Sequence, residues 1–134
     1  LRVVDEMAQA AQRSRPEECC GIVLAEPGDP GLGAHLVPSE NIAASDPRRN
    51  YRLDYRVHLR AIEAETESGA VILAYYHSHP EGLAKPSRLD AALACPGIAY
   101  LIMGLVPRLE LRAWRWRGAR FDEETLQIVR ERQP

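Results

Sequence analysis

Residues 70–93 read AVILAYYHSHPEGLAKPSRLDAAL and combine an apolar segment with a dense group of potential metal ligands. The first seven residues are apolar at odd and even positions alike, the pattern of a central strand covered on both faces. His77 and His79 follow at once, and because side chains alternate along a strand, both imidazoles are predicted on one face. Asp90 lies in the first turn of a helix predicted over residues 87–94, from where it can fold back toward the histidines.

Two imidazoles and a carboxylate form a ligand set for zinc, which in catalytic sites keeps three protein ligands and leaves its fourth position to water. The sequence therefore predicts a Zn²⁺ site of His77, His79 and Asp90, in which the bound water has a pKa of about 7. An H-x-H alone is also typical of histidines that only form hydrogen bonds at a strand end. The wider pattern H-x-H-x7-S-x2-D is far more specific, although the same ligands would also accept iron or cobalt.

Ser87 has two interpretations, and they do not exclude each other. Ser87-x-x-Asp90 after Pro86 is typical of a helix N-cap with an acidic residue in the first turn, which needs no catalytic role. The hydroxyl would also be placed to donate a hydrogen bond to a developing oxyanion, and loss of such a donor typically costs about 10²–10³ in rate.

Regular elements are predicted on both sides of this stretch. The helices are expected over residues 1–14, 55–68, 87–94 and from Asp122 onward, and the strands over residues 19–25, 34–38, 70–76, 98–105 and 109–116. The first two strands form a hairpin around a turn at residues 27–33. These elements predict an α/β (α+β) fold with a mostly antiparallel sheet flanked by helices.

Local signals define several of these boundaries. Asp54 is a suitable N-cap for the helix over residues 55–68, in which Leu59, Ile62 and Thr66 share one face. Asp122 is expected to cap a last helix whose acidic first turn and basic last turn suit the helix dipole. Trp114 and Trp116 break the alternation of their strand, which predicts a β-bulge.

Composition narrows the class of protein. The 134 residues suit one domain, residues 1–134, with 46% apolar and 27% charged residues. A net charge of −2, with scattered arginines, argues against nucleic acid as a partner. No apolar run approaches the roughly 20 residues of a membrane helix. Three cysteines, two of them adjacent, form no disulfide framework and favour the cytoplasm.

The motif closely resembles the signature of the JAMM (MPN-plus) metalloprotease family, a distant glutamate followed by H-[ST]-H-x7-S-x2-D. Residues 77–79, Ser87 and Asp90 match this signature at every spacing. Residues 16–21, PEECCG, look like the P-x-E-x-C-G that opens the first strand of bacterial members, and this register makes Glu18 the family's glutamate. Residues 41–54 are similar to the loop before the second helix of compact prokaryotic members.

The resemblance implies a role for each matching residue within a single JAMM/MPN-like domain with a curved sheet. His77, His79 and Asp90 would bind Zn²⁺. Glu18 would accept a proton from the zinc-activated water and later deliver one to the leaving amine, and Ser87 would support the tetrahedral intermediate. A glutamate within reach of such a water is a competent general base whatever the family.

The resemblance also implies a substrate class. Eukaryotic relatives cleave ubiquitin chains with the help of insertions, but only seven residues separate His79 from Ser87 here. The implied reaction is therefore hydrolysis of the peptide or isopeptide bond after the C-terminal Gly-Gly of a small ubiquitin-like sulfur-carrier protein. The identity of the carrier, the released group and the oligomeric state are not predicted.

Two other functions compete with this one. A catalytically silent interaction scaffold is a role of other MPN-type members, which usually lose a ligand or the glutamate; here all five positions are intact. RadC-type proteins linked to DNA repair share an H-x-H and the fold. Their motif differs around the second histidine, and this chain has neither a basic face nor an added DNA-binding module.

Overall fold

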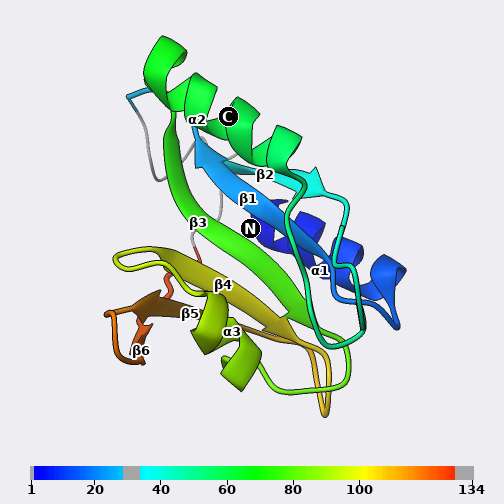
Figure 1. The fold of residues 1–134 in the computed structure, drawn as a ribbon. Helices are drawn as coiled ribbons and strands as arrows, with labels where there is room; N and C mark the ends of the chain where they lie inside the picture. Colours follow the sequence, from blue (N-terminus) through cyan, green and yellow to red (C-terminus); the bar gives the residue numbers. More distant parts are fainter. Residues whose placement is uncertain (1, 29–33, 129–134) are drawn as a thin grey trace.

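Six strands form one sheet at the centre of the computed structural model, which describes residues 2–28 and 34–128. The strands are β1 (Cys20–Ala25), β2 (Ala34–Ser39), β3 (Val71–His79), β4 (Ala99–Gly104), β5 (Glu110–Trp116) and β6 (Phe121–Glu124) (Figure 1). They lie in the order β2-β1-β3-β4-β5-β6, and only the β3–β4 pair is parallel. The mostly antiparallel α+β fold and the hairpin of the first two strands are confirmed.

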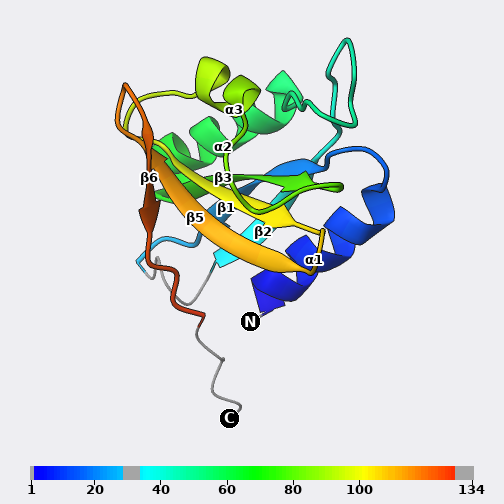
Figure 2. The same cartoon turned by 90° about the horizontal axis from the view of Figure 1, so that it is seen from below.

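Helices cover both faces of this sheet. They are α1 (Arg2–Ser14), α2 (Tyr55–Ser68) and α3 (Arg88–Leu93). Figure 2 shows α1 on one face and α2 and α3 on the other. None of the helices in the described ranges is long and apolar enough to cross a membrane.

The two faces of β3 contribute to different parts of the core. Ala74 and Tyr76 pack with Met7 of α1, and the Tyr76 hydroxyl donates a 2.8 Å hydrogen bond to the Met7 carbonyl. Tyr75 packs instead with the cluster beneath α2. Since side chains alternate along a strand, His77 and His79 continue the Tyr75 face and lie on the side of α2 and α3.

Helix α2 has the predicted ends, and the face shared by Leu59, Ile62 and Thr66 is its exposed face. Asp54 accepts a hydrogen bond from the Arg56 amide, and Gly69 ends the helix with a left-handed φ of 75°. The side chains that pack on the sheet are Val57, Ala61 and Ala64. Leu59 and Ile62 are instead 52% and 44% exposed, so the face that they share with Thr66 points away from the core. Val57, Ala61 and Ala64 pack in one cluster with Ile22 and Leu24 of β1, so mostly small side chains occupy the contact between α2 and the sheet.

The helix expected from Asp122 is wrong, because residues 121–124 form strand β6 and pair with β5. Phe121 packs against Trp116, with ring centroids 4.9 Å apart, and Arg115 forms an ion pair with Glu124. These cross-strand contacts outweigh local capping signals. Residues 125–128 have no regular structure, and the remainder of the expected helix, like most of the expected turn at 27–33, lies outside the described residues.

The β-bulge expected at Trp114 and Trp116 is also wrong. Strand β5 pairs in continuous register with β4 and with β6. The register shift in this sheet lies between β1 and β3, next to Val23 and Leu24. The tryptophans break the alternation because both faces of β5 carry large side chains, not because the strand contains an extra residue.

Gly104, at the end of β4, is required by a close backbone contact. An added Cβ would lie 2.4 Å from the Ala84 nitrogen and 2.6 Å from the Leu83 carbonyl carbon. Gly104→Ala is therefore expected to lower the free energy of unfolding by about 1–3 kcal/mol in urea titrations. Gly82→Ala is the matched control, since its Cβ would meet only the His79 Cβ at 3.8 Å. Equal stability of the two variants would contradict this packing.

Candidate metal centre

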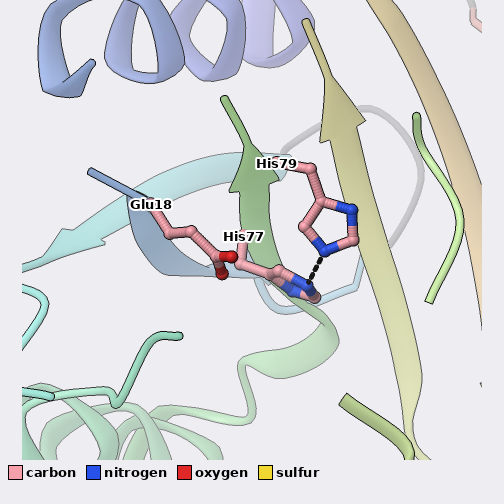
Figure 3. A group of neighbouring side chains, drawn as sticks. All are labelled: Glu18, His77 and His79. Carbon is pink, nitrogen blue, oxygen red and sulfur yellow. Dashed lines mark hydrogen bonds between the residues drawn. The ribbon is translucent and has the colours of Figure 1, made fainter. Parts of the chain in front are cut away.

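The pairing of β1 with β3 places a glutamate beside two histidines. His77 lies opposite Cys20 in the antiparallel register. One step further, the Ser78 amide donates to the Cys19 carbonyl at 3.0 Å, and the Cys19 amide donates to the Ser78 hydroxyl at 2.9 Å. Glu18 precedes this contact, and Figure 3 shows its carboxylate directed toward His77 and His79.

Three of the predicted site residues, His77, His79 and Asp90, meet at one point, and Glu18 lies beside the two histidines. The Nε2 atoms of His77 and His79 are 3.2 Å apart. Asp90 Oδ2 lies 3.2 Å from the first and 3.0 Å from the second. Glu18, His77 and His79 each offer a ligand atom within 4.8 Å of the others. The histidines come from the end of β3, Asp90 from α3 and Glu18 from the segment before β1.

Ser87 holds the helix that carries Asp90. Its hydroxyl accepts the Asp90 amide at 3.0 Å, and Asp90 Oδ2 accepts the Ser87 amide at 2.8 Å, which completes a capping box. The N-cap interpretation of Ser87 is therefore confirmed. The same carboxylate oxygen that meets both histidines is thus fixed by the first turn of α3.

Burial controls the protonation of the carboxylates and imidazoles. Desolvation raises the pKa of Glu18 to about 8, because this side chain is only 5% exposed. Burial likewise lowers the pKa of His77. Burial opposes ionisation of Asp90, but hydrogen bonds from both histidines hold its pKa well below the usual range. Burial also works against a charged His79, but the hydrogen bonds to Asp90 prevail and raise its pKa.

The spacing of the ligand atoms in this centre fits a metal ion. The His79 Nδ1 lies 2.9 Å from the Leu83 carbonyl, so when the ring is neutral with the proton on this nitrogen, its Nε2 presents a lone pair that a metal ion can take. Without an ion, the same Nε2 lies 3.2 Å from the Nε2 of His77 and 3.0 Å from Asp90 Oδ2, where a proton on Nε2 completes a hydrogen bond to the carboxylate. A tetrahedral ion with bonds of 2.0–2.1 Å would hold its ligand atoms about 3.3 Å apart. Glu18 Oε1 is buried without a partner among the described residues, which leaves it available for chemistry beside such an ion.

Sequence patterns missed one residue of this site. The Tyr51 ring stacks on the His77 imidazole, with centroids 4.3 Å apart and planes 18° from parallel. Tyr51 lies in a loop without periodicity, so no pattern in the sequence indicates which ring it meets. Its contact fixes the orientation of the buried imidazole.

The family model for prokaryotic homologs of the JAB domain matches residues 1–117, which includes the whole centre. The chain belongs to this family. The JAB domain described here is 33% identical over 127 residues to the desampylase of Haloferax volcanii, with 94% of this chain and 88% of that protein covered. It is 31% identical over 132 residues to the CysO-cysteine peptidase of Mycobacterium tuberculosis, with 96% and 88% covered.

A solved structure agrees with the fold of this JAB domain. The solution structure of protein DSY2949 from Desulfitobacterium hafniense superposes with a TM-score of 0.82 at 29% identity. The match covers 97% of this chain and 90% of that chain. The arrangement of strands that brings Glu18 beside the two histidines is thus that of a known fold.

The raised pKa of Glu18 gives the metal-free JAB domain a defined pH dependence. Between the ordinary value of 4.5 and about 8, the folded state binds more protons than the unfolded state, so stability falls as pH rises through this window. Glu18→Gln is expected to remove this loss and to stabilise the chelated protein by about 1–3 kcal/mol at pH 9 but little at pH 4.5. Thermal unfolding of both proteins across this range measures the difference. A constant difference would contradict the assignment.

Proposed function

We propose that this JAB domain is a zinc hydrolase that cleaves the peptide or isopeptide bond after the C-terminal Gly-Gly of a small ubiquitin-like sulfur-carrier protein. One observation carries the proposal. Two imidazole nitrogens and a carboxylate oxygen lie within 3.2 Å of one another, with the buried, unpartnered carboxylate of Glu18 beside them. This is the donor set of a catalytic zinc site, together with a general base.

The relatives support the substrate class. A desampylase and a CysO-cysteine peptidase each align with nearly the whole chain. The resemblance of the motif to the JAMM signature implies, for this chain, a ubiquitin-like carrier that ends in Gly-Gly. The three cysteines of the chain are all free thiols, which supports the cytoplasm as the place of action. An intact set of His77, His79, Asp90 and Glu18 argues against a silent scaffold.

The side chains divide the chemistry among them. His77, His79 and Asp90 would hold the metal, which when bound supplies Lewis acidity to water and to the scissile carbonyl. Glu18 takes a proton from the attacking water and returns it to the leaving amine. In the metal-free protein burial raises the pKa of Glu18 to about 8, and a bound cation nearby would lower it again toward the range in which a base can both take and return a proton. Asp90 keeps its charge, which suits a metal ligand.

Variants of Ser87 test whether the N-cap of α3 also takes part in catalysis. Ser87→Ala removes the hydroxyl that accepts the Asp90 amide, so we expect a loss of about 1 kcal/mol of stability. If the hydroxyl also donates to the oxyanion of the intermediate, kcat falls by about 10²–10³ while zinc content is retained. Ser87→Asp, which keeps a capping oxygen but has no hydroxyl, separates the two effects. Full activity of Ser87→Asp would restrict Ser87 to capping.

The reaction itself is tested by intact mass spectrometry. Small carrier proteins that end in Gly-Gly, each extended by a short C-terminal peptide, are incubated with the zinc-loaded JAB domain. We expect loss of the extension and a free Gly-Gly terminus, and no change when a chelator is present. A carrier whose two glycines are replaced by alanines is the matched control. If every extended carrier keeps its mass although zinc is bound, the hydrolase proposal is wrong.

A further inference from the structure

A cavity of about 590 Å³ adjoins the metal centre on the α2 and α3 face of the sheet. Asp90 belongs to its wall, so the cavity opens directly beside the centre. The other sides come from the loop over residues 43–53 and from α2, α3, β3 and β4. Its lining includes Ala43, Leu53, His58, Tyr75, Ile98 and Tyr100.

Three polar side chains in this wall, those of His58, Tyr75 and Tyr100, already have hydrogen-bond partners. His58 Nε2 and the Tyr75 hydroxyl form a 2.7 Å hydrogen bond. The Tyr100 hydroxyl accepts the Cys95 amide at 3.0 Å. Apart from Asp90, Arg52 is the one residue of fixed charge in the lining, and it is exposed. The cavity therefore offers mainly carbon surface and favours an apolar occupant.

The position of the cavity along β3 indicates which part of a substrate reaches it. Tyr75 and His77 point to the same face and lie two residues apart, which corresponds to about 7 Å along a strand. An extended Gly-Gly also spans about 7 Å. When the bond after Gly-Gly lies at the metal centre and the tail runs along β3 toward Tyr75, the residue before Gly-Gly comes to lie over the cavity.

We propose that this cavity is a specificity subsite that receives an apolar side chain from the residue immediately before the Gly-Gly of the substrate. The inference rests on the proposed function and adds a selection rule to it. Glycines have no side chains with which to select a carrier, whereas a leucine-sized side chain finds a largely preformed apolar site. Burial of such a side chain in the transition state raises kcat/KM rather than only the affinity for the ground state.

The test uses synthetic peptides in which Xaa-Gly-Gly is joined by a peptide bond to a five-residue extension, with Xaa as leucine, alanine or aspartate. Cleavage by the zinc-loaded protein is followed by mass spectrometry. We expect kcat/KM for the leucine peptide to exceed that for the alanine peptide by about 10-fold or more, and aspartate to be the poorest. A second set of peptides varies the residue after the scissile bond, and here we expect kcat/KM to change by less than about 3-fold.

Variants that fill the cavity test whether the preference for the leucine peptide arises there. Ala43→Phe and, independently, Ile98→Phe should reduce the leucine-to-alanine ratio to about 1 while the alanine peptide is cleaved within about 3-fold of its original rate. Ala92→Phe adds the same bulk to the exposed surface of α3, outside the lining, and should keep the ratio. Two folded cavity variants that both retain the full ratio would overturn the assignment.

The outcomes separate the two proposals. Equal cleavage of leucine and alanine peptides, or selection only by the residue after the bond, would overturn the subsite and leave the hydrolase intact. Absence of cleavage of every peptide and every extended carrier, with zinc bound, would overturn the hydrolase and the subsite with it.

Discussion

Glu18→Gln is expected to lower turnover by about 10²–10⁴-fold while the protein still binds one metal ion per chain. The substitution keeps the shape of the side chain and removes its ability to accept and return a proton. Glu18 is not needed to close the ligand set, because Asp90 Oδ2 already lies within 3.2 Å of both Nε2 atoms. Metal content by mass spectrometry and kcat on an extended carrier are the two readouts.

Glu17→Gln is the matched control for this prediction. Glu17 is the neighbouring residue, but its side chain is exposed, whereas Glu18 is buried. Full activity of Glu17→Gln beside an inactive Glu18→Gln would identify Glu18 as the general base. Near-normal turnover of Glu18→Gln would refute this mechanism, and loss of the metal in that variant would make Glu18 a ligand instead.

His77→Ala and Asp90→Asn are expected to lose metal and activity together. Each removes one of the three groups that would hold the ion, so affinity for zinc should fall by more than about 100-fold and turnover should fall to background. Asp90→Asn keeps the volume and a capping oxygen for the Ser87 amide, so α3 should stay folded. Zinc titrations by calorimetry and circular dichroism of the apo proteins provide the measurements.

A histidine outside the centre provides the control for the loss of ligands. His35 lies in β2, with its side chain 44% exposed and 3.6 Å from a carboxylate oxygen of Glu26. His35→Ala should therefore bind zinc and turn over like the original protein. If Asp90→Asn binds zinc as tightly as the His35 variant, then Asp90 is not a ligand.

Site residues that lie close together along one strand or within one helical turn were predictable from the sequence. The apolar run of residues 70–76 led to the central strand, and alternation placed His77 and His79 on one face. Ser87 and Asp90 were correctly predicted to form a cap, because both partners lie within one helical turn. Glu18 lies 59 residues before His77, and only the resemblance to a family predicted that the two would meet.

The features that the sequence did not predict all depend on contacts between segments that are distant in the chain. Charges and a cap predicted a helix from Asp122, but pairing of Phe121 and Glu124 with β5 decided the structure of that segment. The hydrogen bond between His58 and Tyr75 and the stacking of Tyr51 on His77 depend on how distant segments pack. Such contacts leave no periodic signal in the sequence.

The most direct test of the central claim is a zinc titration of the chelated protein in which bound metal and carrier cleavage are measured in the same samples. We predict that activity rises in proportion to bound zinc and reaches its maximum at one ion per chain. Glu18→Gln should bind the same single ion without activity. Cleavage that persists in the metal-free protein, or that does not follow occupancy of one site, would contradict a hydrolytic centre built from Glu18, His77, His79 and Asp90.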